Sequence, residues 1–250
     1  MRWRAALLGL VTTAIAVVLI VLAVLCIPGL SYLAAFPHIF TGKVIGPILE
    51  RLPYTLELIG VSFLVASVLA FGCVQFSIRT LKPLATFLAV VLRCVPFFWL
   101  AMVLQLVFAI LGGFQAGKTS GSDRFDLVDH LRYLAGASGA LTLFQLPSLI
   151  EYFNKRLAVC AKGRNNFAAS ILSGLAVQFA ENLPDVITAT IITELVFAWP
   201  GVGRLLYSGD GNLSASLPTG ILLFLALLVL AVRFVTEAFA RSPDEGASDG

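Results

Sequence analysis

The sequence predicts an all-α membrane protein with about six transmembrane helices and both termini in the cytoplasm. Of its 250 residues, 59% are hydrophobic and only 12% are charged, and the mean hydropathy is +0.95. A soluble domain carries about a quarter charged residues, so this chain has too few polar groups to cover a globule in water. Much of its solvent must therefore be lipid.

Six apolar stretches are long enough to cross a bilayer, since a span needs roughly 20 mostly apolar residues. They cover residues 7–27, 54–77, 86–111, 134–150, 171–198 and 218–238. The fifth contains polar residues, so five or seven spans are the alternatives. The first follows basic residues as in a signal peptide, but its length exceeds the usual 7–15 residues and favours a retained span. We expect one membrane domain over 1–250, with a disordered tail at 242–250.

Basic residues in the loops predict the orientation, because short cytoplasmic loops are enriched in Lys and Arg. With the N-terminus inside, the cytoplasmic side carries Arg2, Arg4, Arg79, Lys82, Lys155, Arg156, Lys162, Arg164 and Arg241. The outer side carries Lys43, Arg51, Lys118, Arg124, Arg132 and Arg204. Basic residues are most concentrated at 155–164. The net charge of +3 thus reports orientation and is no evidence for nucleic acid binding.

Four connections between the spans have distinct compositions. Outer connections are predicted at 28–51, 112–133 and 199–217, and the Gly and Ser content of the second argues against long helices there. The inner segment 151–170 mixes basic, apolar and small residues in amphipathic order. It is either a short amphipathic helix that meets headgroups or a partner, or an ordinary positively charged loop.

Polar residues inside the fifth span are candidates for function, because ionisable groups in a membrane are costly and usually face a bundle interior or water. Gln178, Glu181, Asn182 and Asp185 form this set, and Glu181 and Asp185 share a helical face. They either line a transport pathway or form a structural hydrogen-bond cluster between helices. Elsewhere, snorkelling to the interface explains Arg93, and Glu57 and Glu194 are expected to be exposed at outer span ends.

The remaining reactive residues indicate no catalytic or metal site. Cys26, Cys73, Cys94 and Cys160 are scattered rather than clustered, and the two histidines, His38 and His130, are isolated in outer loops. Residues 112–119, GGFQAGKT, match the spacing of the G-x-x-x-x-G-K-[ST] phosphate-binding motif, but they follow an apolar span and not a strand, so the structural context of a phosphate-binding loop is missing. We therefore expect no cofactor in this chain and no enzymatic activity.

Three motifs together resemble the permease subunits of bacterial ABC importers, in the dipeptide, oligopeptide and nickel branch. The first, residues 51–72, reads RLPYTLELIGVSFLVASVLAFG; the second, residues 95–114, reads VPFFWLAMVLQLVFAILGGF. The third, residues 192–206, reads ITELVFAWPGVGRLL and is similar to an acidic-x-x-F-x-x-P-G-x-G-x-L signature. They stand in the family's order and cover roughly residues 50–240.

The resemblance implies a type I permease fold in the bacterial inner membrane. It also implies a second permease subunit, two ATP-binding subunits that hold ATP and Mg, and an extracytoplasmic solute-binding protein as partners. A short coupling helix, parallel to the membrane, would contact the ATPase through Arg156, Ala161, Lys162 and Gly163. An outer gate or binding-protein contact would involve Glu194, Pro200, Gly201 and Gly203.

Two departures from the family pattern bear on these expectations. The outer connection after the first span is short, and the stretch from Gly163 to Glu194 is also short, with Cys160 where the family has a basic residue. The expected function is a pore subunit of an ATP-driven importer, most simply for peptides. The alternatives are a self-contained secondary transporter or channel, and nickel or metal-chelate cargo.

Overall fold

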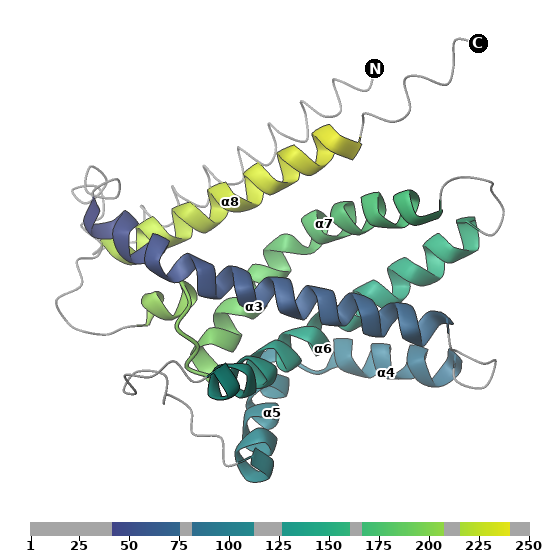
Figure 1. Cartoon of the computed structure of the whole chain (residues 1–250), viewed down its shortest axis with the longest axis horizontal. Coiled ribbons are helices and arrows are strands. Elements are labelled where there is room, and N and C mark those ends of the chain that lie inside the picture. Colours follow the sequence, from purple (N-terminus) through teal and green to yellow (C-terminus); the bar gives the residue numbers. More distant parts are fainter. Residues whose placement is uncertain (1–41, 76–81, 113–126, 161–166, 208–215, 241–250) are drawn as a thin grey trace. The chain divides into compact units, whose positions relative to one another are not determined.

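A computed structural model describes residues 42–75, 82–112, 127–160, 167–207 and 216–240 (Figure 1). Every regular element in these ranges is helical, and none is a strand, so the all-α prediction is confirmed for this part of the chain. The elements are α3 (Gly42–Gln75), α4 (Lys82–Cys94), α5 (Phe97–Gly112), α6 (Leu127–Cys160), α7 (Phe167–Val196), the 3₁₀ helix η3 (Gly203–Leu206) and α8 (Ser216–Ala240). The predicted first span, 7–27, and the tail lie outside the described residues.

The helices belong to two compact units. One unit holds the described residues 42–50, 172–184 and α8; the other holds the rest of α3, α4, α5, α6, residues 185–207 and the start of α7. In the first unit, Ile221 and Leu225 lie one turn apart on α8 and are buried, while Leu222 and Leu227 are exposed. An apolar helix with an exposed apolar face is typical of a helix that meets lipid.

Two of the described helices are long and apolar enough to cross a membrane. These segments are Ile45–Gln75 in α3, with 31 residues, and His130–Leu157 in α6, with 28. At 1.5 Å per residue they extend about 46 and 42 Å, beyond a hydrocarbon core of about 30 Å. Phe97–Leu111 and Gly220–Thr236 are shorter apolar helices. By this measure α7, which carries the polar residues of the predicted fifth span, is not among the spanning candidates.

Helices α3 and α6 extend past the predicted span boundaries. Residues 42–51 are helical, although 28–51 was predicted to be a connection, and α6 begins at Leu127 inside the predicted outer loop 112–133. At its other end α6 continues through 151–160, so this part of the predicted coupling segment is not a separate short helix. Hydropathy marks only the hydrocarbon layer, whereas a helix satisfies its own backbone hydrogen bonds on both sides of that boundary.

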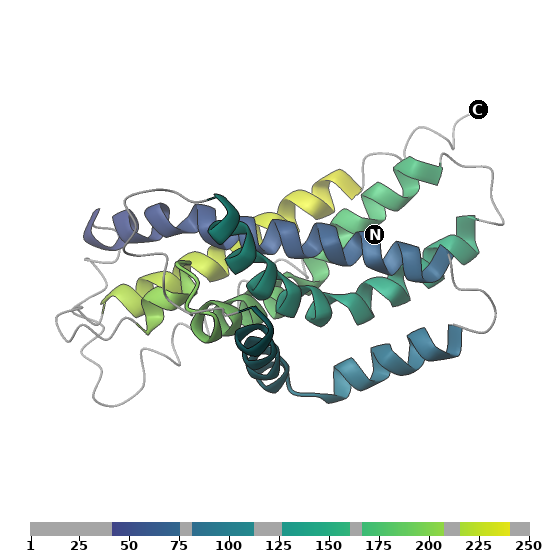
Figure 2. The same cartoon turned by 60° about the horizontal axis from the view of Figure 1, so that its bottom comes forward.

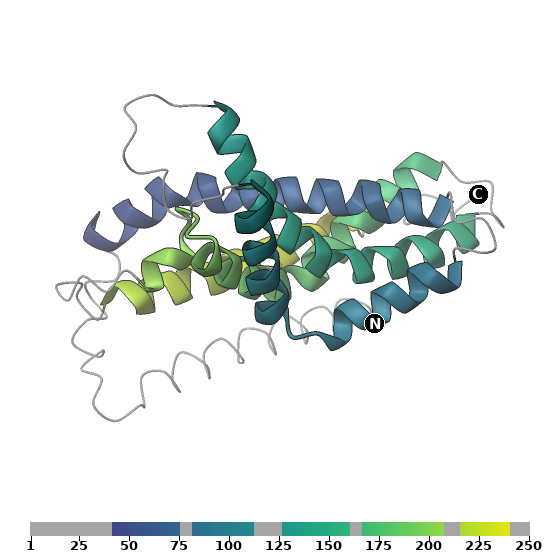
Figure 3. The same cartoon turned by 90° about the horizontal axis from the view of Figure 1, so that it is seen from below.

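The predicted third span, 86–111, is not one helix but two. Helix α4 ends at Cys94, and α5 begins at Phe97 and runs in a different direction (Figures 2 and 3). Pro96 causes the break, because proline has no backbone N–H and disfavours helical geometry at the residue before it. Its carbonyl accepts hydrogen bonds from the N–H groups of Trp99 at 3.0 Å and Leu100 at 3.3 Å, which starts the new helix.

Helix α6 is the centre of the second unit. It packs against α4 and α5, and buried polar groups join it to α3. Gln145 Nε2 donates to Ser62 Oγ at 2.9 Å, and Thr142 Oγ1 donates to the Ser62 carbonyl at 3.3 Å. Hydrogen bonds of this kind hold helices together in lipid, where apolar contacts alone discriminate poorly between partners.

Candidate functional site

A buried carboxyl group lies near the C-terminal end of α7. The Glu194 side chain is 0% exposed, so the prediction that it is exposed at an outer interface is wrong. Burying a carboxyl group is costly unless it is hydrogen-bonded. Thr55 Oγ1 donates to Glu194 Oε1 at 2.7 Å, and the backbone N–H of Arg204 donates to Oε2 at 3.2 Å. These donors compensate for the loss of water.

The Thr55 hydroxyl joins three parts of the chain. It lies on α3, donates to Glu194 on α7, and accepts the backbone N–H of Val202 at 2.8 Å. The buried Thr55 hydroxyl therefore acts both as a donor and as an acceptor. We call Glu194, Thr55, Val202 and Arg204 the Glu194 cluster. It fixes the turn after α7 against α3.

Two glycines leave room for this carboxyl group. A Cβ on Gly201 would lie 2.5 Å from Glu194 Oε2 and closer still to Oε1, and a Cβ on Gly203 would lie 2.8 Å from Oε2. Neither glycine adopts a left-handed φ, so the requirement is for space rather than for conformational freedom. The P-G-x-G sequence is therefore needed because the turn passes directly over the carboxyl group.

Trp199 also anchors this turn. Its ring stacks on Tyr133 with centroids 5.4 Å apart, and its Nε1 donates to the Tyr54 carbonyl at 3.0 Å. The Tyr133 hydroxyl donates to the Phe197 carbonyl. Ala198 has a positive φ of 55°, which is uncommon for a residue with a side chain, and its carbonyl accepts from Arg204 Nη1 at 2.6 Å.

A half-buried pair lies beside this turn. His130 Nε2 and Glu57 Oε1 are 2.9 Å apart, and the His130 ring lies 5.5 Å from that of Trp199. Glu57 was predicted to be exposed at a span end, but 35% of its side chain is exposed and it pairs with α6. His130 was predicted to be an isolated loop residue, but it lies in α6 because that helix begins at Leu127.

The predicted outer residues come together in this site. Glu194, Gly201 and Gly203 are in direct proximity, and half-buried Pro200 lies between Trp199 and Gly201, where the Gly201 N–H bonds back to the Trp199 carbonyl at 2.9 Å. Their assignment to a gate or to a binding-protein contact stays a prediction. The burial of Glu194, Gly201 and Gly203 fits a role in holding the turn in place.

The predicted pathway residues all lie on α7. Glu181 and Asp185 are exposed, Gln178 and Asn182 are half-buried, and Asn182 Nδ2 donates to the Gln178 carbonyl at 3.0 Å. The last bond is one turn long within a single helix, so it does not join two helices. The four residues lie on one helix, and their role as a transport pathway stays a prediction.

Only part of the predicted ATPase-contact set can be located. Arg156 is half-buried near the end of α6, while Ala161, Lys162 and Gly163 lie outside the described residues. Among the residues that the structure describes, no group of three or more His, Cys, Asp or Glu side chains could hold a metal ion.

Thr55, Tyr133 and Trp199 were not singled out from the sequence as site residues. Thr55 stands in the first motif and Trp199 in the third, so the motifs carried a signal, but the bond between Thr55 and Glu194 joins residues 139 positions apart. The second motif lies close to α6 as well. A Cβ on Gly136 of α6 would lie 3.3 Å from the ring of Phe197, in the third motif, and 3.8 Å from the ring of Phe108, in the second motif. All three motifs therefore meet at α6 and the turn after α7.

Comparison with known proteins supports the resemblance that these motifs indicated. The chain is 24% identical to the oligopeptide transport system permease protein AppB of Bacillus subtilis (strain 168) over 185 residues. The match covers 63% of this chain and 57% of that protein, so it spans little more than half of the relative's length. No protein-family model matches the chain. The chain is similar to a permease protein of a peptide transport system.

Replacing Thr55 by Val is expected to lower stability, whereas Ser is expected to be tolerated. Valine has the shape of threonine but no hydroxyl, so it leaves Glu194 Oε1 and the Val202 N–H without this partner. Each buried polar group left unsatisfied costs about 1–3 kcal/mol. Thermal unfolding in detergent measures the effect, with a fall of about 2–4 °C expected for each kcal/mol. Equal melting temperatures for the Val and Ser variants would contradict the role of the hydroxyl.

Proposed function

We propose that the chain is a non-catalytic translocation-pore subunit of an ATP-driven ABC importer, with short peptides as cargo. The observation that carries the proposal is the buried bond between Thr55 and Glu194, because it unites two motifs that resemble those of importer permeases. The similarity to a permease protein of an oligopeptide transport system supports both the transport role and the cargo class.

In this proposal the chain forms about six spans in the bacterial inner membrane, with both termini in the cytoplasm. A second permease subunit completes the pore, two ATP-binding subunits hold ATP and Mg, and an extracytoplasmic binding protein delivers the peptide. The length and apolar character of α3 and α6 support a membrane location.

The proposed mechanism is alternating access driven from the cytoplasmic side. The ATPase subunits contact Arg156, Ala161, Lys162 and Gly163, and their closure moves α6 as a rigid element, so that the spans rock between inward-open and outward-open states. Gln178, Glu181, Asn182 and Asp185 line the pathway on α7. The exposure of two carboxylates, Glu181 and Asp185, suits peptides, whose amino termini are positively charged.

Co-expression with candidate ATPase, permease and binding-protein subunits of a peptide importer from the same organism tests the proposal. We expect the ATPase subunits to co-purify, and we expect Gly163→Val to lose them while the second permease stays bound. Gly60→Val is the matched control, because Gly60 is exposed and a Cβ there meets nothing within 4 Å. Transport by the chain alone after reconstitution would instead identify a secondary transporter or channel.

A further inference from the structure

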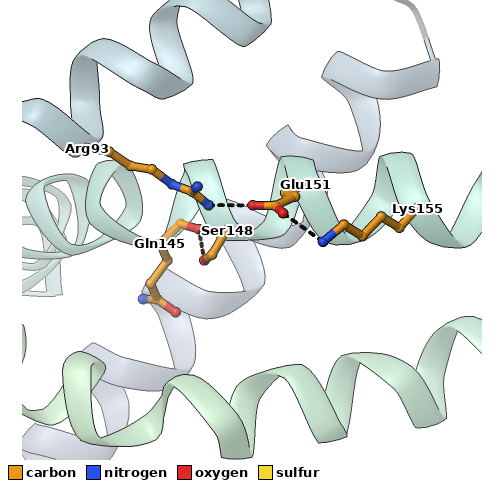
Figure 4. Close-up of polar contacts among 5 residues, drawn as sticks. All are labelled: Arg93, Gln145, Ser148, Glu151 and Lys155. Atoms are coloured by element: carbon orange, nitrogen blue, oxygen red, sulfur yellow. Dashed lines mark hydrogen bonds and ion pairs between the residues drawn. The ribbon is translucent and has the colours of Figure 1, made fainter.

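A carboxylate between two cations joins the end of α4 to α6. Arg93 Nη2 lies 2.8 Å from Glu151 Oε2, and Lys155 Nζ lies 2.7 Å from Glu151 Oε1. Figure 4 shows that Arg93 approaches from α4, whereas Glu151 and Lys155 lie on successive turns of α6. Arg93 was predicted to snorkel to the interface, but the structure gives it a specific partner on another helix.

The position of this pair matters more than its strength. About half of each side chain in the Arg93–Glu151 pair is exposed, and exposed ion pairs contribute little to stability. However, Arg93 is in the last turn of α4, immediately before the break at Pro96 from which α5 starts. The pair therefore links α6 to the junction at which the chain turns from α4 into α5.

Two of the polar contacts of α6, those of Gln145 and Glu151, leave it on different sides. Gln145 reaches Ser62 on α3 through a buried bond, while Glu151, less than two turns further on, reaches Arg93 on α4. In Figure 4 the Gln145 amide points away from the Arg93–Glu151 contact. Helix α6 contains Arg156 and ends at Cys160, directly before Ala161, Lys162 and Gly163, so the residues that the proposed function assigns to the ATPase contact lie at its end.

We infer that Glu151 is a positioning residue that transmits movement of α6 to the α4–α5 junction through Arg93. This inference rests on the proposed function. Without the carboxylate, α6 would still pack on α4, but the ion pair, which joins one defined position of α6 to one defined position of α4, would be lost. Lys155 belongs to α6 itself and bridges nothing between helices, so it is dispensable for this role.

Cys94 provides a native probe of the movement, because it is exposed and directly follows Arg93. The complete complex is treated with a maleimide, with and without ATP and vanadate, and labelling of the Cys94 peptide is quantified by mass spectrometry. We expect the wild type to show a nucleotide-dependent change in labelling rate. In Glu151→Gln and Arg93→Gln we expect that change to shrink by up to about fivefold, the limit for an exposed pair.

The controls separate transmission from a merely structural role. Lys155→Gln removes a cation from the same carboxylate but keeps the link to α4, so it should behave as wild type. The double variant Arg93→Gln, Glu151→Gln should lose no more of the nucleotide-dependent labelling change than either single variant, because each single variant already removes the same contact between Arg93 and Glu151. Vanadate-trapped nucleotide should be unchanged in all variants.

Three results would overturn the inference: no nucleotide-dependent labelling in the wild-type complex, an undiminished change in Glu151→Gln, or an equal loss in Lys155→Gln. If either Glu151→Gln or Arg93→Gln does not assemble into the complex, the other variant still tests the same contact, because it removes the partner on the opposite helix. Failure of the wild-type chain to bind ATPase subunits would instead contradict the proposed function.

Discussion

Gly201→Ala is expected to destabilise the protein by roughly 2–4 kcal/mol, the sum of an overpacking cost and a lost buried hydrogen bond. The new methyl group would overlap the Glu194 carboxyl group. That group could move only by leaving Thr55 and the Arg204 N–H, which are its hydrogen-bond donors. Thermal unfolding in detergent and the yield of monodisperse protein measure the loss.

Gly60→Ala is the matched control for this substitution. A Cβ at Gly60 meets nothing within 4 Å, and alanine is favoured over glycine inside a helix by about 0.5–1 kcal/mol, so this variant should be neutral or slightly more stable. If both alanine variants unfold at the same temperature, close contact with Glu194 is not the reason for glycine at 201.

A second substitution should suppress the defect at 201. Glu194→Ala removes the carboxyl group and is itself destabilising, because it leaves Thr55 and the Arg204 N–H without their acceptor. In that background the three atoms that lie nearest to the new methyl group of Gly201→Ala are gone. The double variant should therefore be about as stable as Glu194→Ala alone, a non-additive result that reports direct contact. A fully additive loss would contradict it.

Gly203→Ala is expected to be at least as damaging, and Glu194→Ala should not rescue it. A Cβ on Gly203 would lie 2.8 Å from Glu194 Oε2, but also 2.8 Å from Ile191 Cγ1 and 2.9 Å from Ile191 Cα. A side chain can rotate away, whereas a backbone atom moves only if α7 shifts against the turn. Melting temperatures of the single and double variants test this.

Comparing the rescue by Glu194→Ala at positions 201 and 203 tests the packing of the turn more strictly than either position alone. Rescue at 201 without rescue at 203 is expected, since the three atoms nearest a Cβ on Gly201 all belong to the Glu194 side chain, whereas the backbone atom Ile191 Cα is among the three nearest a Cβ on Gly203. Rescue at both positions would show that the turn does not approach Ile191 as closely as the structure places it. Rescue at neither would show that the Glu194 carboxyl group does not set the packing.

The sequence by itself determined the helical, apolar character of the chain and its resemblance to importer permeases. These properties are local: apolar composition follows from a window of about 20 residues, and a motif follows from neighbouring positions. The match to a curated permease protein agrees with the motifs. The ends of α7 and α8 lie within a few residues of the predicted fifth and sixth spans, while the crossing of the membrane by these two helices stays a prediction.

Only the tertiary structure decided which polar residues are buried and what they contact. Glu194 looked like an interfacial residue because the end of an apolar stretch normally meets water, yet α3 and the turn after α7 enclose it. Arg93 looked unpaired because Glu151 is 58 positions away. Contacts at such separations depend on how helices pack, and a pattern along one helix carries no information about the face of another.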